Sequence, residues 1–428
     1  MDILFKNVTA VSMQADNPVL YNANVGITGS KITMVKDSGI NAKRVVDGTG
    51  KLLMPGLYNC HTHAAMTMFR GLAGDLALED WLFNHIFPAE KKLTPHIVYT
   101  GTLLAIAEMV ASGTISFTDM YFNMDEVAKA AYESGVMTNL SNAVVTLGND
   151  NYDYYKSNEY KQTIGVMETY AGDGRIKVDA SIHGVYTSDE KAWGQVLEFA
   201  KKHDLSIHLH LSETKTEHEN CIKKHGMTPA GVFHKNNVFS AQITAAHAVW
   251  VSQEDMDILA AHGAAVSHCP VSNLKLASGV APVKEMLAKC INVALGTDGM
   301  ASNNSHDLFE EIKIASITQK CHCQDPTALP AFDALKMATV NGAASQGRGH
   351  ESGIIAEGYD ADLVLIDLNN PRQTPCYDPL ANLAYSTSGR DVAMTMCKGK
   401  ILYENGEHKT IDIEKVLRET REIMKVFA

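Results

Sequence analysis

The feature that most constrains this fold is a series of short apolar runs, each followed by a longer stretch with helical spacing. The runs cover residues 56–63, 113–120, 137–145, 176–185, 205–213, 242–250, 264–273 and 292–300. A short apolar run followed by a helical segment is typical of a βα unit with a parallel strand. Eight such units close into a (β/α)₈ barrel of the TIM type, whose active site lies at the carboxyl ends of the strands. We therefore expect an α/β chain with its functional residues at the ends of these runs.

The two ends of the chain carry a different pattern, in which apolar and polar residues alternate as in strands. This alternation fills the first fifty residues and returns after about residue 350, before a final helix at 411–427. We expect residues 1–53 and 351–428 to form one small β-sandwich domain, with the closing helix, and residues 54–350 to form the barrel between them.

Charge and composition exclude several classes of protein. The 428 residues include 37 basic and 49 acidic side chains, a net charge of −12, which argues against nucleic acid as a partner. A chain with 45% apolar and 20% charged residues has enough apolar material for a large core. It has neither a basic signal-peptide start nor an apolar run long enough to span a bilayer, so we expect a cytoplasmic protein with no membrane partner.

The eight cysteines are scattered along the chain, which favours reduced thiols over a disulfide framework. One cluster, Cys321-His322-Cys323, lacks the CxxC spacing of a zinc site, and we interpret it as a helix segment with no metal role.

Two histidine pairs and one aspartate end three of the runs. His61 and His63 end the first run, and alternation along a strand places both imidazoles on one face. His208 and His210 end the fifth run, and Asp298 ends the eighth. Three neutral imidazoles and one carboxylate are a good ligand set for a divalent metal.

One histidine of the second pair is then left over as a packed or supporting group. We choose His210 as the ligand, because Glu213 three residues later then reaches the substrate. We expect one divalent metal ion, with Zn²⁺ favoured, although iron, manganese or nickel would accept the same ligands.

Glu213 and His247 are candidates for proton transfer beside this metal. A metal lowers the pKa of bound water to roughly 7, and a nearby carboxylate and imidazole can then move its proton. These two residues and Asp298 can also be explained without a catalytic role. Glu213 is then a carboxylate at the start of a helix, His247 a buried core histidine, and Asp298 a turn residue in GTDG. The combined pattern favours a hydrolytic site.

Taken in order, the motifs PGLYNCHTH, FPAEKKLT, SIHGVYT, HLHLSET, AAHAVW, GTDGMASNN and GYDADLVLIDL resemble the amidohydrolase superfamily, and more narrowly its methylthioadenosine/S-adenosylhomocysteine deaminase branch. The resemblance covers nearly the whole chain. It implies hydrolytic deamination of an adenine nucleoside at C6, yielding the hypoxanthine nucleoside and ammonia. It also implies one zinc ion, held by His61, His63, His210 and Asp298.

Matching positions give the remaining roles. The resemblance implies that Glu213 exchanges a proton with a ring nitrogen, and that Asp298 and His247 handle the proton of the attacking water. Glu90 of FPAE would bind the ribose hydroxyls, and His183 of SIHGVYT would contact the substrate. From the residues alone, without the resemblance, Glu90 would be interpreted as a surface carboxylate and His183 as a histidine at the end of a strand.

One position departs from the family pattern. Relatives that bind a homocysteine carboxylate are expected to carry arginine in the third strand, where this chain has Asn142. We therefore consider a neutral 5′-substituent, as in 5′-methylthioadenosine, 5′-deoxyadenosine or adenosine, at least as good a fit as S-adenosylhomocysteine.

Other interpretations stay open from the sequence. A related ring hydrolase acting on guanine, a pterin or a chlorotriazine has the same architecture, and a non-catalytic metal-binding barrel is a further alternative. The apolar segment 76–87 either covers the pocket, meets a neighbouring subunit or packs in the core. We expect a homo-oligomer, a dimer or a tetramer.

Overall fold

The computed structural model describes residues 1–35, 41–76, 80–147 and 149–427. Every apolar run of the predicted barrel contains a strand, and the fourth run contains two short strands that flank Asp179. The barrel strands are β6 (Leu57–Thr62), β7 (Thr114–Tyr121), β8 (Met137–Asn142), β9 (Ile176–Val178), β10 (Ala180–Ile182), β11 (Ile207–Leu211), β12 (Ile243–His247), β13 (Ala265–His268) and β14 (Asn292–Leu295). Their neighbours pair in parallel, which confirms the predicted fold class.

Backbone hydrogen bonds at two seams join these strands into a ring. The ladders form two sheets, β6-β7-β8-β9 and β10-β11-β12-β13-β14. The first seam lies within the fourth unit, where the Asp179 N–H donates to the carbonyl of Leu140 at 2.8 Å. At the second seam the Asp298 N–H donates to the carbonyl of His61 at 2.9 Å, so the first and last units meet where two predicted metal ligands lie.

Helices follow the barrel strands as the sequence predicts. They are α3 (Pro95–Ala111), α4 (Met124–Ser134), α5 (Asn158–Thr169), α6 (Glu190–His203), α7 (Lys215–His225), α8 (Pro229–Lys235), α9 (Gln253–Ala261), α10 (Pro270–Lys275), α11 (Val283–Ala288), α12 (Leu308–Cys323), α13 (Ala331–Ala338) and α14 (Val340–Ser345). Helix α6 shows why they form: Asp189 caps its first turn, and Trp193, Val196 and Ala200 bury one face.

The connection between β6 and α3 contains short helical segments that matter for the site. These are the 3₁₀ segment η1 (Ala64–Phe69), the π-helical turn η2 (Trp81–Ile86) and the helix α2 (Phe87–Glu90). A π-helical turn is uncommon and is frequently found at functional sites.

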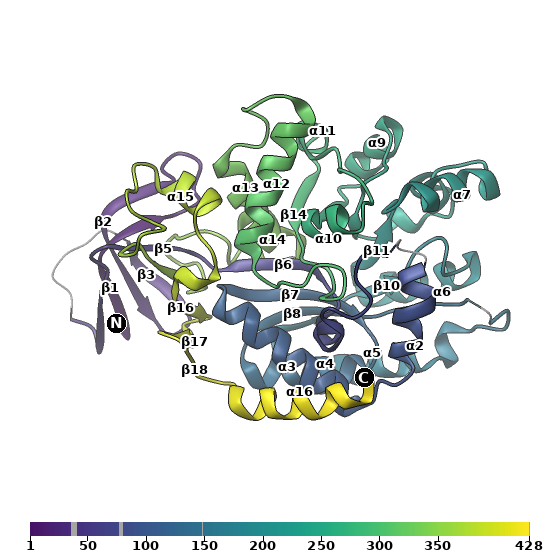
Figure 1. The fold of residues 1–428 in the computed structure, drawn as a ribbon, viewed down its shortest axis with the longest axis horizontal. Helices are drawn as coiled ribbons and strands as arrows, with labels where there is room; N and C mark the ends of the chain where they lie inside the picture. Colours follow the sequence, from purple (N-terminus) through teal and green to yellow (C-terminus); the bar gives the residue numbers. More distant parts are fainter. Residues whose placement is uncertain (36–40, 77–79, 148, 428) are drawn as a thin grey trace.

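The strands of both chain ends join in one nine-stranded sheet (Figure 1). They are β1 (Ile3–Val11), β2 (Val19–Thr28), β3 (Lys31–Val35), β4 (Arg44–Asp47), β5 (Lys51–Pro55), β15 (Leu363–Asp367), β16 (Val392–Cys397), β17 (Lys400–Glu404) and β18 (Glu407–His408). Strand β5 pairs antiparallel with β15, which links the two ends directly. Phe5, Val25, Leu365 and Met396 share one buried cluster. The expected boundary at residues 53/54 lies inside β5, so we propose that the domains divide after Pro55 and at residues 350/351.

Two helices belong to the carboxyl-terminal part of the chain, α15 (Pro379–Tyr385) and α16 (Ile413–Phe427). Helix α16 returns from the end sheet to the barrel and lies along α3 (Figure 1). It buries Val416 and Ile423 there, and Phe427 packs edge-to-face on Phe69 of η1.

Within the described ranges, no single helix has both the length and the apolar character needed to cross a membrane. Two consecutive helical segments, Trp81–Glu90 and Pro95–Ala111, meet the criteria when they are taken together, by length and composition alone. The chain bends by 114° between them.

Candidate active site

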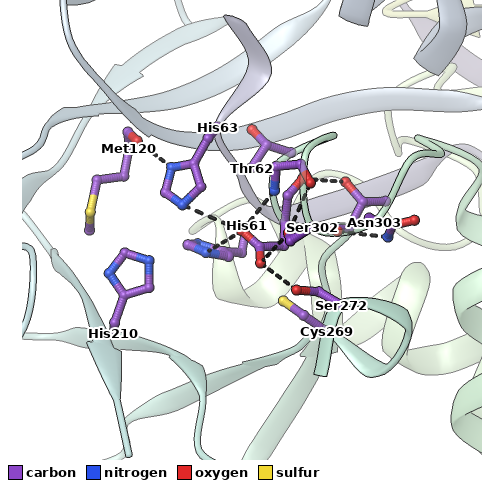
Figure 2. A network of polar contacts seen from close by, with 12 residues as sticks. His61, Thr62, His63, Met120, His210, Cys269, Ser272, Ser302 and Asn303 are labelled. Atoms are coloured by element: carbon purple, nitrogen blue, oxygen red, sulfur yellow. Dashed lines mark hydrogen bonds and ion pairs between the residues drawn. The ribbon is translucent and has the colours of Figure 1, made fainter. Parts of the chain in front are cut away.

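His61 lies near the carboxyl end of β6 and His63 directly follows that strand, and both imidazoles lie close to that of His210 (Figure 2). His63 Nδ1 lies 2.6 Å from the carbonyl oxygen of Met120, which can only accept, so Nδ1 carries the proton. The Nε2 atom of His63 therefore keeps its lone pair when the ring is neutral.

The second histidine pair divides its roles. His210 Nδ1 donates to the carbonyl of His183 at 2.7 Å, which leaves the lone pair of its Nε2 atom available. His208 instead lies behind His61, with its Nε2 atom 2.8 Å from His61 Nδ1. The structure thus places His210 with the β6 pair and His208 as a supporting partner of His61, an arrangement typical around metal-binding histidines.

Asp298 approaches the same histidines from the end of the eighth unit. Its Oδ1 atom lies 3.5 Å from His61 Nε2 and 3.4 Å from His63 Nε2. Its Oδ2 atom accepts hydrogen bonds from the hydroxyls of Ser272, at 2.6 Å, and Ser302, at 2.9 Å. These two serines hold one carboxylate oxygen, while the other lies near the imidazoles and accepts the backbone N–H of Gly299 at 2.7 Å.

This cluster fits a divalent metal. Ligand atoms of His61, His63 and His210 lie within 4.8 Å of one another, and so do those of His61, His247 and Asp298. The His61 Nε2 atom is buried and, among the described residues, has no hydrogen-bond partner. Burial lowers the pKa of His61 to about 4, so the ring is neutral at pH 7 and can donate its lone pair. Neutral imidazoles with one carboxylate are a tetrahedral zinc donor set.

Glu213 and His247 lie beside this cluster. The His247 Nε2 atom is 3.8 Å from Glu213 Oε2, and its Nδ1 atom is 3.0 Å from the side-chain amide of Asn273. Burial, followed by the charge of Asp298, raises the pKa of Glu213 to about 8. Burial lowers the pKa of His247 to about 4. At neutral pH Glu213 therefore holds a proton that it can donate, and His247 is neutral.

Glu90 and His183 also line the cavity that contains these groups. Glu90 lies on α2, and one of its oxygens accepts a hydrogen bond from the Tyr121 hydroxyl at 2.8 Å. Burial raises the pKa of Glu90 to about 7. His183 follows β10, and its Nδ1 atom is 2.8 Å from the hydroxyl of Thr187. Both side chains therefore lie where a bound molecule would meet them.

The rest of the cavity wall is mostly apolar. Its apolar and aromatic lining residues are Met66, Trp81, Leu82, Ile86, Phe87, Met120, Tyr121, Phe122, Ala143, Val145, Tyr186 and Leu276. No lysine or arginine occurs among the described lining residues. Such a wall favours an uncharged substituent on the bound molecule.

The segment 76–87 supplies part of this wall through Trp81, Leu82, Ile86 and Phe87, although residues 77–79 of that segment lie outside the described residues. Asn142 is buried outside the lining and donates to Gln162 at 2.7 Å, while Ala143 and Val145 face the cavity instead. Cys321, His322 and Cys323 end α12 and belong to neither of the metal-compatible groups found among the described residues.

Sequence reasoning did not identify Ser272, Ser302 or Tyr121. Ser272 lies at the end of the seventh apolar run and Ser302 lies two residues after the eighth, so their position at the barrel mouth was the available signal. A serine or tyrosine at such a position has no distinctive spacing, and its contact depends on how separate loops meet.

Three comparisons relate this chain to known proteins. The sequence model of the Amidohydrolase family matches residues 52–402. The chain is 44% identical to a 5-methylthioadenosine/S-adenosylhomocysteine deaminase of Acetivibrio thermocellus, covering 99% of each chain. It is also 44% identical to a 5′-deoxyadenosine deaminase of Methanosarcina acetivorans, covering 98% of this chain and 97% of that one.

Among solved structures, the fold is similar to an adenosine deaminase from Xanthomonas campestris with bound zinc. The TM-score is 0.95 at 30% sequence identity, over 100% of this chain and 98% of that chain.

Proposed function

The chain belongs to the amidohydrolase family, and we propose that it is a metal-dependent aminohydrolase that deaminates adenine nucleosides at C6. The products are the hypoxanthine nucleoside and ammonia. The observation that carries the proposal is that Glu213, Glu90 and most of the His/Asp cluster (His63, His210 and Asp298) line a single cavity. A ring nitrogen, a ribose and a metal can therefore be bound together there.

We propose that His61, His63, His210 and Asp298 hold one divalent metal, with Zn²⁺ as the expected ion. Such a metal would lower the pKa of a bound water molecule and would polarise the bond that this water attacks. The zinc in the Xanthomonas campestris relative and the neutral imidazole donors support this choice. The fourth strand unit ends in His183, not in a lysine that could carry a bridging carbamate, which supports a single ion.

Glu213 donates its proton to N1 of the adenine ring as water attacks C6. Protonation withdraws electrons from a ring that otherwise resists nucleophiles, and acid–base help of this kind supplies about 10²–10⁴-fold in rate. His247 and Asp298 are the groups placed to take the proton of the attacking water. That proton leaves with the amino group as ammonia, and the remaining proton of the new 6-hydroxyl returns to Glu213. The nucleoside and one water thus give the 6-oxo product and ammonia, with each residue back in its starting state.

Glu90 binds the ribose hydroxyls, with Tyr121 fixing one of its oxygens. His183 contacts the substrate from the end of β10. At the 5′-position the apolar wall favours a neutral group, as in 5′-methylthioadenosine, 5′-deoxyadenosine or adenosine. S-adenosylhomocysteine carries a carboxylate, which no cation of the described lining would bind.

The test is ammonia release from these four nucleosides by the purified protein, with elemental analysis of the same sample. We expect about one metal per chain and turnover that is faster on the three neutral nucleosides. Equal activity on adenine and on its nucleoside would favour a base hydrolase over the proposed nucleoside deaminase, and guanine, a pterin and a chlorotriazine test that alternative directly. Absence of ammonia from every compound, with metal bound, would favour a non-catalytic barrel.

The expected homo-oligomeric state, dimer or tetramer, and the expected cytoplasmic location stay predictions. Light scattering on protein eluted from a size-exclusion column tests the oligomeric state, and cell fractionation tests the location.

A further inference from the structure

We propose that Glu217 is a positioning residue for Glu213: its carboxylate holds the backbone between β11 and α7 so that the Glu213 side chain enters the cavity. The inference rests on the proposed function, because Glu213 is the proton donor of that reaction.

The contact is made by both oxygens of one buried side chain. Glu217 lies in the first turn of α7 and is 9% exposed. Its Oε2 atom accepts the backbone N–H of Glu213 at 2.7 Å, and its Oε1 atom accepts that of Ser212 at 3.3 Å. Ser212 has a φ of +46°, so the chain leaves β11 in a left-handed turn that these two bonds stabilise.

The same turn is held from its other side by the neighbouring unit. The Trp250 N–H donates to the carbonyl of Ser212 at 2.9 Å, and the Ala248 N–H donates to the carbonyl of Leu211 at 3.0 Å. Glu217 is itself fixed, because its N–H donates to the Thr214 hydroxyl at 3.1 Å. The peptide that carries Glu213 is therefore anchored to α7 on one side and to the β12 unit on the other.

A carboxylate is an expensive choice at this position. Glu217 is buried next to a second buried carboxyl group, and burying a charge costs free energy. The contacts explain the choice: each of the two N–H groups meets a different oxygen, and a carboxylate offers an acceptor at both places. A glutamine would satisfy one donor and turn its own NH₂ towards the other.

This anchoring has a catalytic consequence. Proton transfer to the ring requires the Glu213 carboxyl to lie within hydrogen-bond reach of N1, and a misplacement of about 1 Å can cost 10²-fold in rate. The Glu213 carboxyl lies 3.8 Å from His247 Nε2, which is too far for a hydrogen bond to fix it there. Its position therefore depends on the backbone that Glu217 holds.

A double-mutant cycle tests the inference. In the metal-loaded enzyme we expect Glu217→Gln to lower kcat about 10- to 100-fold while KM changes less than about threefold. In a Glu213→Gln background, the same substitution should change kcat less than about twofold, because the group that it positions is gone. Additive losses in the double variant would overturn the proposal, since they would show that Glu217 acts independently of Glu213.

Glu219→Gln is the matched control, because Glu219 lies on the same helix and is 51% exposed. It should leave kcat unchanged. If Glu217→Gln does not fold, Glu217→Asp replaces it in the double-mutant cycle, with the same kcat measurements. The aspartate keeps both oxygens but withdraws them by one methylene.

Amide hydrogen exchange gives a readout that needs no substrate. We expect Glu217→Gln to speed exchange of the Ser212 and Glu213 amides at least tenfold, with Glu219→Gln leaving it unchanged. Unchanged exchange would overturn the proposed anchor whatever the activity. A wild-type protein inactive on all nucleosides would refute the proposed function instead, and the exchange result would still decide the anchor.

Discussion

Replacing Glu213 with glutamine should make the enzyme less active and, above mildly acidic pH, more stable. The glutamine keeps the shape of the side chain but cannot donate the proton that the ring nitrogen needs. We expect kcat to fall by about 10²–10⁴-fold with the metal content unchanged, because Glu213 lies outside the four proposed ligands.

The effect on stability follows from the pKa of Glu213. Burial raises it from 4.5 to about 8, so the folded chain keeps this proton over a pH range in which the unfolded chain has lost it. Below pH 4.5 both states hold the proton and the group has no pH-dependent effect. As the pH rises to about 8, the wild type loses stability relative to the variant at about 1.4 kcal/mol per pH unit. The accumulated loss has an upper limit of about 5 kcal/mol.

The assay is urea denaturation of the metal-free wild type and of Glu213→Gln at several pH values between 4.5 and 9. Glu219→Gln, whose side chain is 51% exposed, serves as the control. The difference between wild type and Glu213→Gln should grow with pH up to about 8 and then level off. A constant difference across this range, or near-normal turnover of the variant, would refute the reasoning.

Three further predictions concern supporting residues. Tyr121→Phe removes the hydrogen bond to Glu90 and should raise KM about tenfold for nucleosides but not for their 2′,3′-dideoxy analogues. An equal rise in KM for both groups of substrates in steady-state assays would count against a role of Glu90 in ribose binding. His208→Ala removes the support of His61 and should weaken metal binding 10- to 100-fold in chelator competition, and unchanged affinity would contradict it. Arg348 is fully buried and donates hydrogen bonds to three backbone carbonyls. Arg348→Met should therefore lower the free energy of unfolding, measured by urea denaturation, by about 3–5 kcal/mol. A loss under about 1 kcal/mol would show that those carbonyls find other partners.

The barrel could be predicted because its strands are mostly buried, so each lies in a short apolar run that contrasts with the helical spacing around it. The run 205–213 contains β11, and the run 242–250 contains β12. The fourth run carries the weakest signal, and it is there that the strand is interrupted at Asp179. The shared face of His61 and His63 could be predicted as well, because side chains two residues apart on a strand point the same way.

The supporting contacts could not be predicted, because they join loops that are far apart in the sequence. Ser272 and Ser302 reach one oxygen of Asp298 only because the seventh and eighth units are neighbours in the barrel. Tyr121 ends β7 and meets Glu90 of α2, which lies 31 residues earlier in the sequence. Asn142, selected from the sequence as the departure from the family pattern, lies outside the cavity lining, whose described residues include no lysine or arginine.

The central claim is that His61, His63, His210 and Asp298 bind one catalytic metal. The most direct measurement is anomalous X-ray diffraction at the zinc absorption edge, on crystals of protein loaded with one equivalent of Zn²⁺. We expect a single strong peak about 2.0–2.2 Å from one nitrogen of each imidazole and from an oxygen of Asp298. A peak elsewhere in the molecule, with these four side chains free of metal, would contradict the claim.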